Sequence, residues 1–420
     1  MYSKTTLDSG LRIITSPMPH THSVCIAVFA GVGSRYENDS EAGISHFIEH
    51  ILFRGTAAYP TARHISEAIE GIGGVLNGAT DKELTFFWCK VTEEHFHQAA
   101  AVLTDMVLNS KFDPVDIERE RQVIIEEINM CKDSPSQQAS LLIDEILWPD
   151  HPLGRDIAGT RDSMANMNRT DLKTFLHSKY SPENILISVT GNINQQEVID
   201  TINSLTQNFN TPSSRNQYCP FVEKKCDRLR VINRDTEQIN FCLALPGIGL
   251  MHPKRFHLDL MNVILGEGMS SRLFSEVRDR LGLAYSINSF VEHFLDTGAL
   301  TVSASFDPHN LEKTAATIIE LLESLKDPIP EKELNKAREI SKGRLLLRME
   351  DSRNVAGWLG GQEILTDNIL MLEDVIRIID DITAEQVQQI ARDLINPEKT
   401  KIAIVGPVKD TSSVEQMIRI

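Results

Sequence analysis

Two histidines and a glutamate are spaced so that they could hold a metal ion and activate a water molecule. The sequence HFIEH places His46 and His50 four residues apart, with Glu49 next to the second histidine. On a helix, both imidazoles would project from one face and could bind one ion, with Glu49 on the same side. This is the inverted form of the HExxH zinc helix. The competing interpretation is two structural histidines beside a surface glutamate.

Such a site needs a third ligand from another element, because a zinc ion in a hydrolase is commonly held by two histidines and a carboxylate. The acidic segment 117–128 contains Glu120 and Glu127, seven residues apart and therefore on nearly one face of a helix. Glu126 would point about 100° away from Glu127. An acidic helix that is simply solvated has the same composition, so the spacing alone leaves the third ligand open.

The surrounding sequence predicts the elements that would position these residues. The segment 39–53 reads as a helix that begins with a polar cap and enters an apolar environment. Strand-like runs flank it at 11–15, 23–29 and 84–91, and glycines mark another strand at 73–78. Helical patterns follow these strands, so we expect an α+β fold in which helices are layered on a mostly antiparallel sheet.

An internal repeat indicates that this fold occurs twice. Three matches follow one another at an offset of 215–216 residues: 27–33 (AVFAGVG) with 243–249 (LALPGIG), Pro114 with Pro330, and the strand at 184–191 with 401–406. Matches in the same order at one offset indicate a duplicated domain. We expect homologous domains at 1–210 and 231–420, joined by a linker at 211–230 that begins with the aperiodic sequence TPSSRNQ.

Composition excludes several classes of function. The 420 residues carry a net charge of −17, with no basic run, which argues against nucleic-acid binding. No apolar run approaches the roughly 18 residues of a membrane span, and the N-terminus lacks the apolar region of a secretory signal. The six cysteines form no CxxC pair and require no disulfides. A reducing cytoplasm fits this composition best.

The segment Gly43–Thr56 (GISHFIEHILFRGT) resembles the signature of the pitrilysin/insulysin family of inverzincin peptidases. It is most similar to the branch that contains mitochondrial processing peptidase and its bacterial relatives, and the resemblance extends over essentially the whole chain, including the duplication. It implies a zinc metalloendopeptidase with one Zn²⁺ per chain. Such an enzyme hydrolyses peptides or unfolded protein segments inside a closed chamber, with Glu49 activating the water.

The resemblance also implies which carboxylates serve the metal. In the family, the third ligand follows the second histidine by about 76 intervening residues, which selects Glu127, and a glutamate matching Glu120 supports the site from outside the ligand set. In the second half, the positions 216 residues after His46, Glu49, His50 and Glu127 are Asn262, Leu265, Gly266 and Gly343. The second half is therefore expected to keep the fold and to lack a metal site.

Two further segments match family features. In 268–286, Arg278 and Tyr285 have the spacing of an arginine and a tyrosine that reach the zinc from the opposite side of the chamber, where they could stabilise an oxyanion. Without the resemblance they would read as a surface arginine and a core tyrosine. The segment Asn77-Gly78-Ala79-Thr80 resembles the edge strand that binds substrate, and such an edge can pair with an extended peptide.

The resemblance leaves the assembly open. Larger members fuse four such domains, whereas this chain has two, so a homodimer or a heterodimer with a related subunit is expected. The alternative function is a non-catalytic core or partner subunit of a processing-peptidase-like assembly. The intact set His46, Glu49, His50 and Glu127 favours the enzyme.

Overall fold

The computed structural model describes residues 2–209, 216–408 and 410–417, so residues 211–215 of the expected linker lie outside the described residues. The chain forms two compact units. Unit 1 contains residues 1–129, 155–219 and 347–369, and unit 2 contains residues 130–154, 220–346 and 370–420. The domain boundaries expected from the repeat remain a prediction about the duplicated halves of the sequence.

The sheet of unit 1 has six strands in the order β1-β2-β6-β3-β5-β4. The strands are β1 (Ser3–Thr6), β2 (Arg12–Pro17), β3 (Ser23–Ala30), β4 (Val75–Thr80), β5 (Thr85–Thr92) and β6 (Ile185–Gly191). Only β2 and β6 pair in parallel, and the other neighbours are antiparallel. The central strand β3 is almost wholly buried, as its run of β-branched and aromatic residues predicts.

Among the residues that the structure describes, the sheet of unit 2 repeats this order without a counterpart of β1. It runs β7-β11-β8-β10-β9, again with one parallel pair, β7 and β11. Its strands are β7 (Leu229–Asn233), β8 (Ile239–Pro246), β9 (Ala284–His293), β10 (Gly298–Phe306) and β11 (Lys401–Gly406). The central strands β3 and β8 begin 216 residues apart, at Ser23 and Ile239. The α+β class and the duplication are therefore confirmed.

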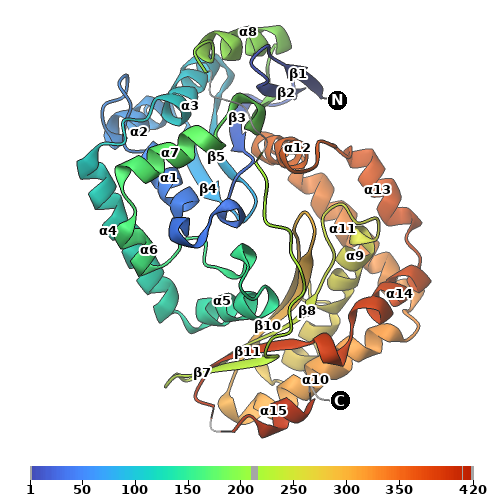
Figure 1. Ribbon diagram of the computed structural model, residues 1–420. Coiled ribbons are helices and arrows are strands. Elements are labelled where there is room, and N and C mark those ends of the chain that lie inside the picture. Colours follow the sequence, from blue (N-terminus) through green and yellow to red (C-terminus); the bar gives the residue numbers. More distant parts are fainter. Residues whose placement is uncertain (1, 210–215, 409, 418–420) are drawn as a thin grey trace. The chain divides into compact units, whose positions relative to one another are not determined.

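Helices cover both sheets (Figure 1). Those of unit 1 are α1 (Ile44–Leu52), α2 (Ala62–Glu70), α3 (Phe96–Asn109), α4 (Pro114–Asp133), α6 (Arg161–Asn166), α7 (Arg169–Lys179), α8 (Gln195–Leu205) and α12 (Ser352–Thr366). Those of unit 2 are α5 (Pro135–Leu147), α9 (Arg255–Leu265), α10 (Leu311–Glu323), α11 (Glu331–Arg348), α13 (Leu372–Asp381), α14 (Ala384–Leu394) and α15 (Ser412–Met417). The end of α4 and the end of α11 cross the unit boundaries.

In each unit, a helix from the other half of the sequence covers part of one face of the sheet (Figure 1). Helix α12 packs on β3 and β6, where Leu359 shares a buried apolar cluster with Phe29 and Trp88. Arg12 of β2 anchors it through an ion pair with Glu363 at 3.1 Å. In the same way, α5 packs on β8 and β11 of unit 2. The two helices are equivalent in the repeat, so the halves have exchanged one helix.

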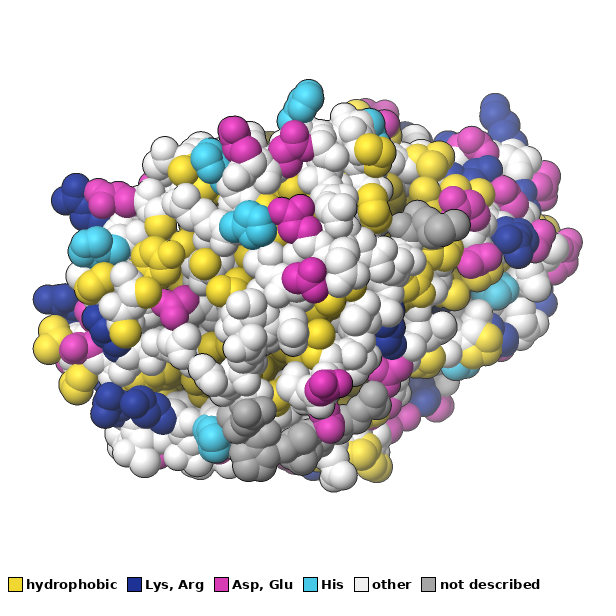
Figure 2. All heavy atoms as spheres, turned by 90° about the horizontal axis from the view of Figure 1, so that it is seen from above, with side chains coloured by type: hydrophobic (Ala, Val, Ile, Leu, Met, Phe, Trp, Pro, Cys, Tyr) yellow, Lys and Arg dark blue, Asp and Glu magenta, His cyan; other side chains and the backbone are white. Residues whose placement is uncertain are grey.

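The surface agrees with the acidic composition. On the face shown in Figure 2, Lys and Arg side chains are dispersed among acidic and uncharged ones, so the described residues on this face form no continuous basic field. All six cysteines are free thiols. Within the described ranges, no helix is both long and apolar enough to cross a membrane.

Candidate metal centre

The helix that carries the two histidines begins later than the sequence suggests. Residues 39–41 form a separate 3-10 turn capped by Asn38, and α1 starts at Ile44. Gly43 interrupts the helix because its φ is +92°, and a Cβ at this position would lie 2.5 Å from the carbonyl oxygen of Ala158. The predicted helix start near residue 39 is therefore wrong, although the histidines are helical as expected.

The buried carboxylate of Glu37 fixes the start of α1. Its two oxygens accept the backbone N–H groups of Gly43 and Ser45, each at 2.8 Å. These bonds satisfy amide groups that a helix start would otherwise leave without partners. Burial raises the pKa of Glu37 to about 7, although both backbone bonds favour the charged form. Glu37 thus holds the first turn of α1, directly before His46.

Helix α1 packs by one face and presents the other toward the site. Its buried positions are Ile44, Ser45, Phe47, Ile48, Ile51 and Leu52. His46, Glu49 and His50 are half-buried on the remaining face. The helical period therefore places all three chemically active side chains on one side, while the apolar side anchors the helix in the core of unit 1.

Helix α4 brings the acidic residues to the same place. It buries Ile117, Glu120, Ile124 and Ile128, and the side chain of Glu127 is 36% exposed. Glu126 is exposed. His46, His50 and Glu127 offer one donor atom each, and these three atoms lie within 4.8 Å of one another. The structure thus gathers the three residues that the family spacing selects.

The spacing of the donor atoms fits a zinc ion. Nε2 of His46 and Nε2 of His50 are 3.3 Å apart, and Oε2 of Glu127 lies 3.8 Å and 3.6 Å from them. Two zinc–ligand bonds of about 2.0–2.1 Å at a tetrahedral angle separate their donor atoms by about 3.3–3.4 Å. The observed triangle is only slightly larger, so small side-chain adjustments would let all three atoms bind one ion.

The histidine pKa values suit metal binding. Burial lowers the pKa of His46 to about 4, with a further contribution from His50, so this ring is neutral near neutral pH. Burial also disfavours the charged form of His50, but its hydrogen bond with Glu120 and the charges of Glu127, Glu120 and Glu49 raise its pKa overall. An ion bound at His50 Nε2 would therefore compete with a proton there.

Glu120 contacts His50 and lies outside the cluster of three candidate ligands. It is 1% exposed, and its Oε2 lies 2.9 Å from Nδ1 of His50. This contact orients the imidazole and leaves Nε2 for the ion. Arg54 forms an ion pair with the other oxygen of Glu120.

The candidate base, Glu49, is held from strand β4. The hydroxyl of Thr80 donates a hydrogen bond to Oε2 of Glu49 at 2.8 Å. Burial raises the pKa of Glu49 overall, although Thr80 and His50 oppose the change. A carboxylate with a raised pKa is a better proton acceptor, which is the property a general base needs.

Comparisons with known proteins agree with this geometry. Residues 12–161 match the family model described as insulinase (peptidase family M16), and residues 166–341 match the peptidase M16 inactive domain. The chain belongs to peptidase family M16. It is 34% identical to an uncharacterized zinc protease of Bacillus subtilis, across 97% of this chain and 98% of that protein, and 34% identical to one of Mycobacterium leprae, across 99% and 94%.

Three solved structures share the fold of this chain. A protease from Helicobacter pylori superposes with a TM-score of 0.92 at 23% identity, covering 97% of this chain and 99% of that one. A peptidase M16 inactive domain from Pseudomonas fluorescens gives 0.90 at 21% identity, covering 97% and 98%. A chain of complex III from Candida albicans gives 0.85 at 19% identity, with 99% of each chain covered.

In the M16 fold of this chain, the second unit has a different polar network at the positions that correspond to the candidate ligands. Asn262, the counterpart of His46, accepts a hydrogen bond from Ser289 at 2.6 Å and donates one to Glu267 at 3.3 Å. Glu267 in turn forms an ion pair with Arg344. Among the described residues, the one cluster of three potential metal ligands is that of His46, His50 and Glu127.

The remaining predicted residues lie at two strand edges. Strand β4, with Asn77, Gly78, Ala79 and Thr80, is the outermost strand of its sheet and pairs with β5 on one side. In unit 2, the guanidinium of Arg278 lies 5.8 Å from the ring centroid of Tyr285, which is the second residue of the outermost strand β9 and is 74% exposed. Arg278 belongs to the π-helical segment η6 (Phe274–Arg280). The structure thus brings Arg278 and Tyr285 together.

Three supporting residues were not anticipated from the sequence in these roles: Glu37 at the helix start, Arg54 on Glu120, and Thr80 as the partner of Glu49. Arg54 had a usable signal, because it lies two residues after the helix that carries both histidines. Glu37 and Thr80 carry no such signal, since each reaches the site from another segment of the fold.

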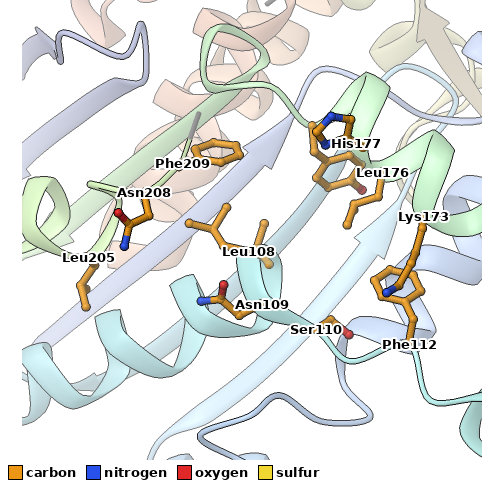
Figure 3. Close-up of a pocket in the computed structure, with 12 residues that line it drawn as sticks. Leu108, Asn109, Ser110, Phe112, Lys173, Leu176, His177, Leu205, Asn208 and Phe209 are labelled. Atoms are coloured by element: carbon orange, nitrogen blue, oxygen red, sulfur yellow. The ribbon is translucent and has the colours of Figure 1, made fainter. Parts of the chain in front are cut away.

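A hollow in unit 1 is separate from the metal centre (Figure 3). It has a volume of about 520 Å³ and is lined by parts of α3 and α7 and by the segment that follows α8. Leu108, Leu176 and Phe209 contribute apolar surface, and Lys173 and His177 stand at its rim. None of the metal-site residues lines it, so it takes no part in the chemistry described above.

Proposed function

We propose that the protein is a zinc metalloendopeptidase in which His46, His50 and Glu127 hold one ion and Glu49 is the general base. The observation that carries this proposal is the triangle of donor atoms at 3.3, 3.6 and 3.8 Å with Glu49 on the same helix face. A bound zinc ion would polarise a water molecule and the carbonyl of the substrate. Glu49 would accept the proton of the attacking water and pass it to the leaving amine.

The edge strand β4 suggests how the substrate is held. An extended peptide can pair with an unpaired strand edge through main-chain hydrogen bonds, which give affinity with little sequence preference. Thr80 lies at the end of this strand and contacts Glu49, so a peptide paired with β4 would lie close to the base. We therefore propose peptides and unfolded protein segments as the substrate class.

The competing function is a non-catalytic subunit of a larger assembly. The fold alone permits it, since a chain of complex III and an inactive M16 domain share this fold. The complete donor set favours the enzyme, because the second unit shows how a site without ligands is rebuilt around Asn262 and an ion pair.

Metal analysis of the purified protein tests the proposal. We expect one zinc ion per chain, hydrolysis of an unstructured polypeptide such as a quenched fluorescent peptide, loss of both after dialysis against a chelator, and recovery on adding zinc. Protein without zinc and without hydrolysis after zinc addition would favour the non-catalytic subunit.

We further propose that the active protein is an assembly in which Arg278 and Tyr285 of one chain serve the zinc site of another. A phenol and a guanidinium are suitable donors to the oxyanion formed when water attacks a peptide carbonyl. The exposure of Tyr285 and its proximity to Arg278 support this role. A homodimer fits the proposal, and so does a heterodimer with a related subunit.

Mixing two inactive variants tests this assembly. Glu49→Gln and Tyr285→Phe proteins are each expected to be nearly inactive, and subunit exchange between them should restore part of the activity. The mixed dimer would contain one site with intact Glu49 opposite intact Tyr285. Rescue is absent if each chain serves its own site, because every site then carries one lesion. Demonstrated exchange without rescue would therefore contradict the shared site.

A further inference from the structure

The buried carboxylate of Glu120 has two oxygens with different partners. Oε2 lies 2.9 Å from Nδ1 of His50, and Oε1 forms an ion pair with Arg54. Glu120 is 1% exposed, so water cannot replace a lost partner. A buried charge that loses its partner is far more costly than an exposed one. The ion pair between Arg54 and Glu120 therefore stabilises the site more than an ordinary surface ion pair would, although the side chain of Arg54 is 37% exposed.

The backbone holds Arg54 in place directly after the metal-binding helix. Its N–H donates to the carbonyl of Ile51 at 3.1 Å, which closes the last turn of α1. The next residue, Gly55, has a φ of +144°, and a Cβ there would lie 2.7 Å from the carbonyl oxygen of Pro60. Gly55 also accepts the N–H of Lys111 at 3.1 Å. This tight turn fixes the backbone next to Arg54, whose side chain reaches Glu120 of α4.

The charges of the site also require a fixed cation. The centre gathers three carboxylates, those of Glu49, Glu120 and Glu127. A zinc ion would supply two positive charges, and Arg54 supplies the third. In the proposed site, Glu127 binds the ion and Glu49 accepts a proton from the water. Arg54 balances the negative charge of Glu120, which does neither.

We propose that Arg54 is a positioning residue of the metal centre, which holds Glu120 in the orientation that presents Nε2 of His50 to the ion. The inference rests on the proposed zinc site. Without Arg54, the Glu120 carboxylate can turn about its terminal bond, and the His50 ring loses its fixed orientation. The ligand set would remain complete but would be less ordered before the ion binds, so the affinity for zinc falls.

Zinc affinity of single variants tests the proposal. By chelator competition, we expect Arg54→Gln to weaken zinc binding by about 10- to 100-fold, as loss of a partner to a ligand commonly does. Arg54→Lys should restore most of the affinity, because an ammonium group can supply the single charged contact. The control is Arg63→Gln, which removes an ion pair from α2 of the same unit where the arginine is 84% exposed. This variant should bind zinc as the wild type does.

A double variant separates positioning from general destabilisation. If Arg54 acts through Glu120, Arg54→Gln should weaken zinc binding much less in a Glu120→Gln background than in the wild type. The chelator-treated Arg54→Gln protein should stay folded at the temperature of the binding assay, although its unfolding temperature should fall because the buried Glu120 has lost a partner. Equal affinity of Arg54→Gln and wild type, or full additivity with Glu120→Gln, would overturn the positioning role. A wild-type protein that binds no zinc would instead overturn the metal site itself.

Discussion

Glu49→Gln protein is expected to retain its zinc and to lose peptide hydrolysis. The amide cannot accept a proton from the attacking water, and loss of a general base typically lowers the rate by about 10²–10⁴-fold. The substitution is nearly isosteric, and the hydroxyl of Thr80 can still donate to the remaining carbonyl oxygen of residue 49. Metal content by mass spectrometry and kcat/KM with a fluorogenic peptide measure the two effects separately.

The control for this variant is Glu70→Gln, an exposed glutamate at the end of α2 in the same unit. It should leave both zinc content and kcat/KM unchanged. Full hydrolysis by Glu49→Gln would remove Glu49 from the mechanism. Loss of zinc together with activity would mean that Glu49 shapes the metal site instead of acting on the water.

Glu127→Gln should lose the metal, whereas Glu126→Gln should keep it. Only Glu127 places a carboxylate oxygen near both histidine Nε2 atoms, at 3.8 and 3.6 Å, while its neighbour is exposed on another face of α4. An amide is a much weaker zinc ligand than a carboxylate, so the affinity should fall by more than the roughly 10- to 100-fold expected for a residue outside the ligand set. Chelator competition monitors this loss.

Glu126→Gln is the matched control, since it makes the same chemical change one residue away. If Glu126→Gln empties the site and Glu127→Gln does not, the ligand assignment on α4 is wrong by one position. Equal zinc affinity in both variants would mean that no carboxylate of this pair completes the site.

The duplicated fold could be predicted because it rests on local patterns. The alternation of strand and helix signals and the offset of 216 residues are features of the sequence itself. The corresponding strand orders of the two sheets agree with them. The exchange of α5 and α12 could not be predicted in this way. An amphipathic helix shows that one face is buried, but its sequence does not say which of two similar sheets covers that face.

The metal cluster was also accessible from sequence, since His46 and His50 share a helix and the family spacing points to Glu127. The residues that support the cluster were harder to find. Glu37, Thr80 and Arg54 act through only one or two contacts each with α1 or α4. Charged and hydroxyl side chains are common, and only the folded arrangement shows which of them meet a ligand or the base.

The exchange of α5 and α12 affects how the chain folds during synthesis and whether a fragment of it can fold. The arrangement is that of a domain-swapped dimer whose two copies have been joined into one polypeptide. Unit 1 holds the proposed metal ligands, yet the face of its sheet that carries Phe29 and Trp88 is covered by Leu359 of α12. During synthesis this face stays uncovered until α12 has left the ribosome. A fragment ending at residue 210 would carry all three proposed ligands and still lack the helix that covers this face.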